Sequence, residues 1–375
     1  MTIGLVLMVF HFLISERITS LSELRILLYA PLTVPIAIFC LITFISGAAN
    51  GGSNEAFKSF WSWRGMLVYF WAYWTFMSNK KLRALSVASI LIVSSIAGLW
   101  ATIEQVTGFH PFSFPYLQGT GFISGPMAFS GLAQLFSFLA LGIALKQGSK
   151  ELPRWLARTL VFYTFLACNF LGLIFCGERS AWFGAAIALL ATSFLISYRT
   201  VLLAGLILTI STIIGWLTLP VVRERLTSLL NWQSDISVST RIILWDKAWQ
   251  VFQQSPIFGV GIRHFPHLVI PEALQQGHLA LDHAHSNYLH ILATMGIVGI
   301  CAYLYLWFSA LKVAYTEQKI TNYTNLDKGI CLGIFAGIVS LLVSGLFEYN
   351  FGTGQVRLAQ WFLLAMLVNS TTYKN

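Results

Sequence analysis

The chain has 375 residues, of which 57% are hydrophobic and only 10% are charged, and its mean hydropathy is +0.72. A soluble domain carries about 25% charged residues, so this composition excludes a water-soluble globule. The 13 Trp, 13 Tyr and 29 Phe suit lipid-facing helices with aromatic belts at both membrane interfaces. The sequence therefore predicts an all-α integral membrane protein that crosses the bilayer many times.

The net charge of +9 would suggest a nucleic-acid partner in a soluble protein. Here most basic residues lie in short loops between apolar segments, where they reflect membrane topology. We therefore expect no nucleic-acid partner. All five cysteines lie within or beside apolar stretches without a CxxC pair, which indicates neither a disulfide framework nor a thiolate metal site.

Apolar segments of the required length recur along the whole chain. A bilayer core of about 30 Å needs about 20 apolar residues per helix, which predicts a bundle of about 10–12 transmembrane helices. The candidate spans are residues 3–14, 27–46, 60–77, 84–103, 126–146, 155–176, 180–198, 201–219, 286–312, 329–349 and 355–370. The first span is too short to cross unaided, and residues 1–15 lack the features of a cleaved signal peptide. The glycine-rich residues 47–53 predict a flexible outer loop.

Basic residues in alternate loops predict the orientation. One set of loops holds 14 Lys and Arg and the other holds 9, five of them in a single long loop. Positive residues are retained in the cytoplasm, so the first set and the C-terminus are expected inside and the long loop outside. This divides the chain into transmembrane helices over residues 1–219, a long outward-facing loop over residues 220–285, and C-terminal transmembrane helices over residues 286–375.

The long loop contains an expected amphipathic helix. Apolar residues recur at helical spacing from Ile242 to Phe252, with Ser239 or Thr240 as the cap and an end near Gln254. Arg241 falls in the middle of the apolar arc. A guanidinium there needs an anion such as a lipid phosphate, or it reaches the interface and pairs with a headgroup as an ordinary anchor.

Two further features lie at the same predicted membrane face as this helix. Arg179 precedes the span over residues 180–198, and the segment from His283 through His285 to Asn287 precedes the span that follows the long loop. Charged groups at membrane edges usually face an aqueous cavity, and the three features can converge on one. The alternatives are an interfacial turn residue for Arg179 and an exposed polar loop for the histidines.

Histidines concentrate in and just after the long loop, where a zinc site is the competing interpretation. They are His264, His267, His278, His283, His285 and His290. No cysteine or carboxylate completes a familiar ligand set, so we expect no metal. The turn Gly259-Val-Gly261 lacks the strand and helix of a dinucleotide fingerprint, and it places Arg263 near the loop.

These segments resemble a known family. His285-Ser286, followed after nine residues by Gly296 and then by Gly299, resembles the His-(Asn/Ser/Gln)-x9-Gly-x2-Gly pattern of bacterial O-antigen ligases. Residues 178–182 (ERSAW) are similar to an Arg-containing segment that opens a helix in the wider O-antigen ligase and polymerase superfamily. Residues 240–261 look like the outer-loop helix and turn of that superfamily. The resemblance covers about a third of the chain.

The sequence departs from the family pattern in two ways. The family usually has twelve spans with both ends inside, whereas ten complete spans and a short one are found in this chain. The Arg-xxx-Leu motif of some ligases is matched only by Arg225 to Leu229.

The resemblance implies transfer of a glycan from undecaprenyl pyrophosphate to a sugar hydroxyl of lipid A-core. The transfer would invert the anomeric carbon, at the periplasmic face of the bacterial inner membrane, without a cofactor or metal. Imidazole is a suitable base for a hydroxyl nucleophile, and Arg can hold pyrophosphate oxygens bidentately. His285 is therefore assigned as the base, with Arg179 and Arg241 as the pyrophosphate clamp. Further substrate contacts are expected from Arg263, Glu178, His283 and Asn287.

Two alternatives stay open. A polymerase of the same superfamily, which joins lipid-linked repeats, has the same donor and chemistry and differs only in its acceptor. A transporter should place ionisable residues near the bilayer midplane and show broken helices or repeats. Charged residues in this chain lie almost entirely at span ends, which favours the glycan transferases.

Overall fold

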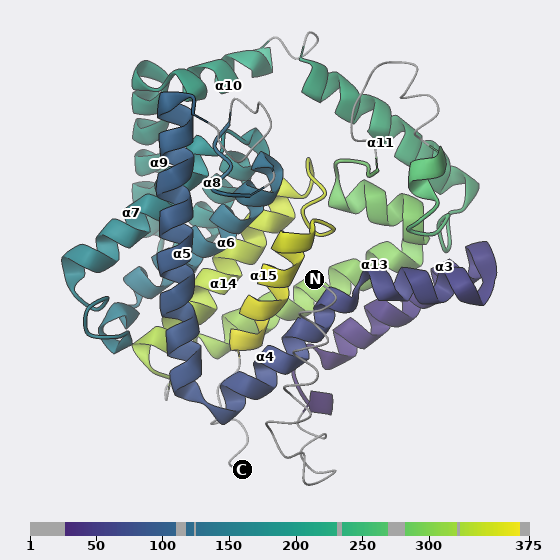
Figure 1. The fold of residues 1–375 in the computed structure, drawn as a ribbon, viewed down its shortest axis with the longest axis horizontal. Helices are drawn as coiled ribbons and strands as arrows, with labels where there is room; N and C mark the ends of the chain where they lie inside the picture. The colour runs from purple at the N-terminus through teal and green to yellow at the C-terminus, as the bar shows by residue number, and fades with distance from the viewer. Residues whose placement is uncertain are drawn as a thin grey trace.

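The computed structural model describes residues 27–109, 118–123, 125–230, 235–268, 282–320 and 323–367, and the candidate span 3–14 lies outside these ranges. All regular structure within them is helical (Figure 1). Six of these helices, α3, α5, α6, α9, α13 and α14, are long and apolar enough to cross a membrane. The prediction of an all-α, multi-pass membrane protein is confirmed.

Most of the helices follow one another with short connections, and the longer ones precede α6 and α13. In chain order they are α3 (Thr33–Ser62), η1 (Arg64–Met66), α4 (Leu67–Ser78), α5 (Lys80–Thr107), α6 (Pro126–Leu145), η2 (Gly148–Glu151), α7 (Thr159–Phe175), α8 (Arg179–Phe194), α9 (Tyr198–Thr218), α10 (Pro220–Leu230), α11 (Ile236–Gln254), α13 (Asn287–Glu317), α14 (Asn325–Ser344), α15 (Gly354–Leu364) and η3 (Ala365–Leu367).

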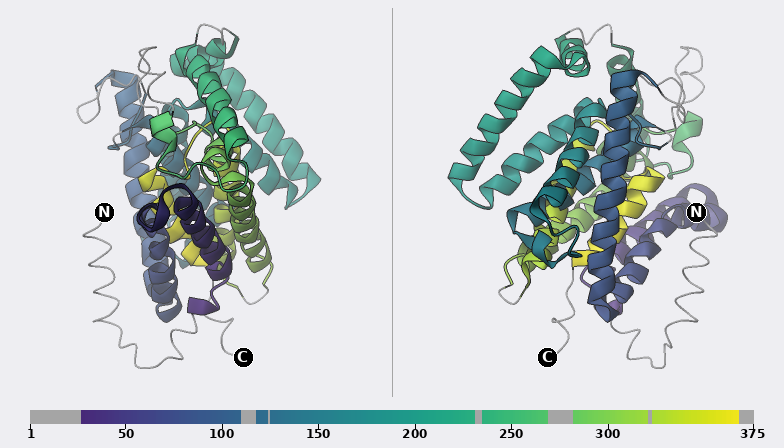
Figure 2. Two further views of the ribbon diagram at one scale, coloured as in Figure 1. Left: turned by 90° about the vertical axis from the view of Figure 1, so that its right-hand side faces the viewer. Right: turned by 60° about the vertical axis from the view of Figure 1, so that its left-hand side comes forward.

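The centre of the bundle is the contact between α6 and α14, and α8 also packs against α14. Gly142 of α6 faces Gly329 and Gly333 of α14 so closely that a Cβ at Gly142 would overlap their backbone atoms. Small residues let membrane helices approach to backbone contact, where van der Waals packing is greatest. The helix α9 stands at the edge of the bundle (Figures 1 and 2), where only Ala204 and Gly215 among its residues are buried.

The prediction of a flexible loop at residues 47–53 is wrong, because the chain reverses tightly within α3 at this point. Gly52 has a φ of 69°, which glycine adopts without strain, and Gly47 packs directly on the backbone of Ala56. The reversal is fixed further by Asn50, whose Nδ2 donates to the carbonyl oxygen of Gly259 at 2.9 Å. The small residues that suggested mobility instead permit a close helical hairpin.

Two helix ends also differ from the sequence prediction. The helix α11 begins at Ile236, because Asp235 caps it by accepting a hydrogen bond from the backbone N–H of Ser237 at 2.9 Å. The expected cap, Ser239 or Thr240, lies inside the helix. At the other end of the chain, α14 ends at Ser344, and residues 345–353 form a loop. The predicted span 329–349 wrongly included the first part of this loop, residues 345–349.

A kink in α13 explains one of the motif glycines. Gly296 has a φ of 66°, and a Cβ there would overlap the backbone of Ile257 in the turn after α11. The turn and the kink exchange backbone hydrogen bonds, from Val260 to Ala293 at 3.1 Å and from Ile297 to Pro256 at 2.9 Å. The end of α11 is thereby held against the first half of α13.

The α6–α14 contact makes a direct prediction for stability. Gly142→Ala should destabilise the protein by about 1–3 kcal/mol, because the added methyl group overpacks the helix crossing. The matched control is Gly205→Ala in α9, where a Cβ would have nothing within 4 Å. Thermal unfolding of the purified protein in detergent should show a lower melting temperature for Gly142→Ala only. Equal melting temperatures for the two variants would contradict the packing argument.

Candidate active site

A cavity of about 640 Å³ lies where the start of α8 meets α10, α11 and the loop after α14. Three arginines, Arg179, Arg225 and Arg241, line it together with the carboxyl group of Glu178. Its other walls are largely apolar, including Phe183, Ile242, Trp245 and Phe347. The cavity therefore offers concentrated positive charge beside an apolar surface, as a lipid-linked anion requires.

Arg179 begins α8, as the sequence predicted from residues 178–182. Its Nη1 donates to Asp235 Oδ2 at 2.7 Å and to Ser228 Oγ at 2.6 Å. Burial favours the protonated form of Asp235, but the hydrogen bond and the charge of Arg179 outweigh it and lower the pKa of this carboxyl. The ion pair thus links the start of α8 to the cap of α11.

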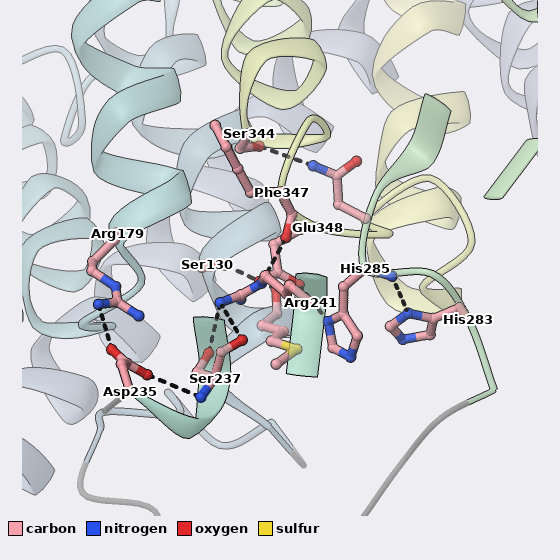
Figure 3. A network of polar contacts seen from close by, with 12 residues as sticks. Ser130, Arg179, Asp235, Ser237, Arg241, His283, His285, Ser344, Phe347 and Glu348 are labelled. Carbon is pink, nitrogen blue, oxygen red and sulfur yellow. Dashed lines mark hydrogen bonds and ion pairs between the residues drawn. The ribbon is translucent and has the colours of Figure 1, made fainter. Parts of the chain in front are cut away.

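Arg241 extends from α11 toward the loop after α14 (Figure 3). Its Nη2 forms an ion pair with Glu348 Oε1, and its Nε donates to the carbonyl oxygen of Phe347 at 3.1 Å. Its Nη1 donates to Ser237 Oγ at 2.6 Å. Three different hydrogen-bond acceptors therefore fix the guanidinium plane beside the cavity.

His285 lies on the other side of the same carboxylate. Its Nδ1 is 3.5 Å from Glu348 Oε2, and its backbone has a φ of 45°, the left-handed region that non-glycine residues seldom adopt. Burial favours a protonated Glu348, but His285 and Arg241 together lower the pKa of this carboxyl. Glu348 is therefore an anion that Arg241 and His285 share.

Asn287 holds the loop that carries Glu348. Its backbone N–H donates to the carbonyl oxygens of Gly345 and Glu348, at 2.8 and 3.2 Å. Its side-chain amide donates to Asn350 Oδ1 at 2.7 Å and accepts from the Phe351 N–H at 3.1 Å. The buried amide thus acts as both donor and acceptor within the protein, and Asn287 positions the loop rather than lining the cavity.

Glu178 is buried at the N-terminal cap position of α8. Burial and the nearby charge of Glu348 raise its pKa to about 7, against the opposing effect of Arg241, Arg225 and Arg179. This carboxyl therefore changes charge near neutral pH inside an otherwise basic cavity.

His283 lies against His285, with ring centroids 4.3 Å apart, and its Nδ1 accepts a hydrogen bond from the His285 backbone N–H at 3.2 Å. Burial and the neighbouring His285 lower the pKa of His283 to about 4. A neutral His283 acts as a hydrogen-bond acceptor that stabilises the unusual backbone of His285.

Arg263 is not brought to this cavity. Its side chain is 52% exposed and its Nε lies 3.5 Å from Glu55 Oε2 of α3. His278 lies outside the described residues. Over the described ranges no group of three His, Cys, Asp or Glu side chains is placed to hold a metal ion.

Sequence reasoning missed Glu348 and Asp235, the acidic partners of the two arginines. Glu348 was included in an apolar span, and it is 107 positions from Arg241, so no local pattern connects the pair. Asp235 could have been found as a capping residue before Ser237. Arg225 lines the cavity, and its match to the Arg-xxx-Leu motif with Leu229 could have identified it as a site residue.

The middle of the chain matches a known family. Residues 164–304 match the model of a family described as O-antigen ligase, and this range contains Arg179, Arg241 and His285. The resemblance to the O-antigen ligase superfamily is therefore confirmed over this part of the chain. No curated protein matches the sequence. The family match supports a glycosyltransferase-like ligase or polymerase that acts on lipid-linked glycans in the membrane.

The raised pKa of Glu178 predicts how anion binding depends on pH. Below about pH 7 the carboxyl is neutral, and above it the cavity gains a negative charge. Affinity for a pyrophosphate diester, whose own charge is constant in this range, should fall several-fold as pH rises through 7. Equilibrium binding to the purified protein measures this. Glu178→Gln should bind tightly and almost independently of pH, and a variant with the wild-type pH profile would exclude Glu178 as the cause.

Proposed function

We propose that this protein transfers an undecaprenyl-pyrophosphate-linked glycan, such as O-antigen, to a sugar hydroxyl of lipid A-core. The observation that carries the proposal is the contact series Arg241–Glu348–His285 at the edge of a cavity lined by three arginines. It combines a candidate base with a binding site for a leaving pyrophosphate. Arg241 and His285 lie within residues 164–304, which match the O-antigen ligase family, and Glu348 follows that segment.

His285 is the proposed base. Glu348 faces Nδ1, which favours the tautomer with the proton on Nδ1 and leaves the Nε2 lone pair to accept a proton. The acceptor hydroxyl gives this proton to Nε2 while its oxygen forms a bond to the anomeric carbon. A single displacement of this kind inverts the anomeric configuration.

The leaving pyrophosphate takes the electron pair of the broken glycosidic bond. Arg179 and Arg241 are held in fixed orientations by Asp235 and Glu348, so they need little reorganisation to stabilise the new charge. Arg225 has no carboxylate within 4 Å among the described residues, which leaves its charge available to the donor. Fixed guanidinium groups can thus supply the stabilisation that a divalent metal provides in other enzymes.

The charge bias of the loops supports the proposed location. With the basic loops in the cytoplasm, α10, α11 and the loop after α14 face the periplasm, and the chain lies in the bacterial inner membrane. Both the donor and lipid A-core then reach the cavity from the outer leaflet, beside its apolar wall.

A deletion strain tests the proposed function. Loss of all polysaccharide-bearing lipid A-core, with accumulation of lipid-linked polymer, is the expected lipopolysaccharide banding pattern. The wild-type gene should restore the long bands. A strain that retains a single repeat on lipid A-core would instead identify a polymerase, and an unchanged pattern would remove both functions.

The base assignment predicts a graded series of variants. His285→Ala should lower kcat by about 10²–10⁴, the usual contribution of a general base. Glu348→Gln should lower it by about 10–100-fold, because the residue orients the base. His283→Ala is the matched control and should lose less than tenfold, measured as transfer by purified enzyme with and without chelator. Equal losses in His283→Ala and His285→Ala, reversed by zinc, would replace the base mechanism with a metal site.

A further inference from the structure

A second pair of arginines lies on η1 and α15, separate from the cavity residues. Arg357 of α15 packs over Gly65 and has its Cζ 5.4 Å from the ring centre of the buried Trp63. Arg64 of η1 stacks over Trp61 at 5.8 Å. The two guanidinium groups are close enough to influence each other electrostatically.

These two arginines differ from Arg179 and Arg241 in their partners. Arg179 and Arg241 are each paired with a carboxylate, whereas neither Arg64 nor Arg357 has one within 4 Å in the part of the chain that the structure describes. Arg64 donates one hydrogen bond, from Nη1 to the carbonyl oxygen of Trp61 at 3.0 Å. The Nε atoms of both residues are buried without a hydrogen-bond partner.

Two adjacent, half-buried cations that lack a counter-ion are energetically unfavourable. An anion placed between them would cancel their repulsion and satisfy the buried Nε donors. The planar, multidentate guanidinium group matches phosphate oxygens in particular.

Arg357 is connected to the proposed catalytic groups through the loop after α14. Thr353 and Tyr349 line a small cleft with His283 and Glu348, and Arg357 follows Thr353 by one helical turn. The Tyr349 ring is 5.2 Å from the His283 ring and is electrostatically coupled to Arg357. Phe347, by contrast, lines the cavity with the three arginines. The loop therefore separates two basic regions, one at each side of Glu348.

We propose that Arg64 and Arg357 bind a phosphate group on the acceptor glycolipid and so orient its sugar hydroxyl toward His285. This inference rests on the proposed function. The pyrophosphate of the donor already has the cavity of Arg179, Arg225 and Arg241, so a second anion site suits the other substrate. Exposed aromatic residues beside the pair, Phe57, Phe60 and Trp61, are suited to the headgroup depth of a bilayer, where a phosphorylated glycolipid presents its phosphates.

Steady-state transfer in nanodiscs of neutral lipid tests this proposal with two acceptors, phosphorylated lipid A-core and the same glycolipid after dephosphorylation. In the variant Arg64→Gln/Arg357→Gln, the KM for the phosphorylated acceptor should rise about tenfold or more, as expected for lost charge-assisted contacts. The kcat, the donor KM and the KM for the dephosphorylated acceptor should stay unchanged. Arg223→Gln, at an exposed arginine of α10, is the matched control and should resemble wild type.

Other results would overturn the proposal. Equal KM increases for both acceptors would show that the arginines only support the fold. If the KM for the phosphorylated acceptor stayed at the wild-type value in the double variant, as it should in Arg223→Gln, no phosphate would be bound by Arg64 and Arg357. If a bulk anionic phospholipid competed with the phosphorylated acceptor at equal concentration, the pair would be a general lipid-binding site. If inorganic phosphate alone competed equally well, the pair would bind a free anion.

Binding separates this inference from the proposed function. A fluorescent phosphorylated lipid A-core analogue should bind wild type in neutral nanodiscs and bind the double variant at least about tenfold more weakly. If wild type bound the analogue more tightly than the double variant but transferred no glycan, the proposed function would be rejected and the phosphate site retained. Transfer by wild type with equal binding to both proteins would retain the function and reject the site.

Discussion

The buried carboxylate of Glu348 organises this end of the protein. A buried anion is costly unless it is paired, and here Arg241 of α11 and His285 before α13 both face it. Three chain segments that are distant in sequence must therefore meet at one point. Asn287 fixes the loop that carries Glu348, and Asp235 and Arg179 join α11 to α8. The position of the basic cavity, and the orientation of the proposed base beside it, follow from these pairings.

Each proposed catalytic group thus has an acidic or hydrogen-bonding partner that fixes its orientation. This arrangement keeps the arginines close to charge balance when no substrate is bound, while their planar groups stay directed by fixed contacts. Arg64 and Arg357 follow a different rule, because the described protein supplies no counter-ion for them. The contrast between paired and unpaired arginines distinguishes groups organised by the protein from groups that await an anion.

Sequence reasoning identified what local patterns encode. Composition predicted the membrane class, Arg179 was expected at the start of a helix, and the glycine in the His285 motif corresponds to the kink at Gly296. Pairing across long separations left no such pattern. Glu348 follows Leu346 and Phe347 directly, so its loop looked like part of a span. At residues 47–53 the local pattern was present but ambiguous. Small residues suit a tight reversal as well as a mobile loop, and the prediction chose the loop.

The backbone contacts between the turn after α11 and the kink of α13 also constrain motion. Hydrogen bonds from Val260 and Gly261 to α13, and from Ile297 back to Pro256, tie the C-terminal end of α11 to the helix that begins just after His285. Any displacement of α11 that widens the cavity must either break these bonds or carry the first half of α13 with it. In the second case Arg241 and His285 travel as one rigid unit, and their spacing is preserved while a bulky glycan enters and leaves.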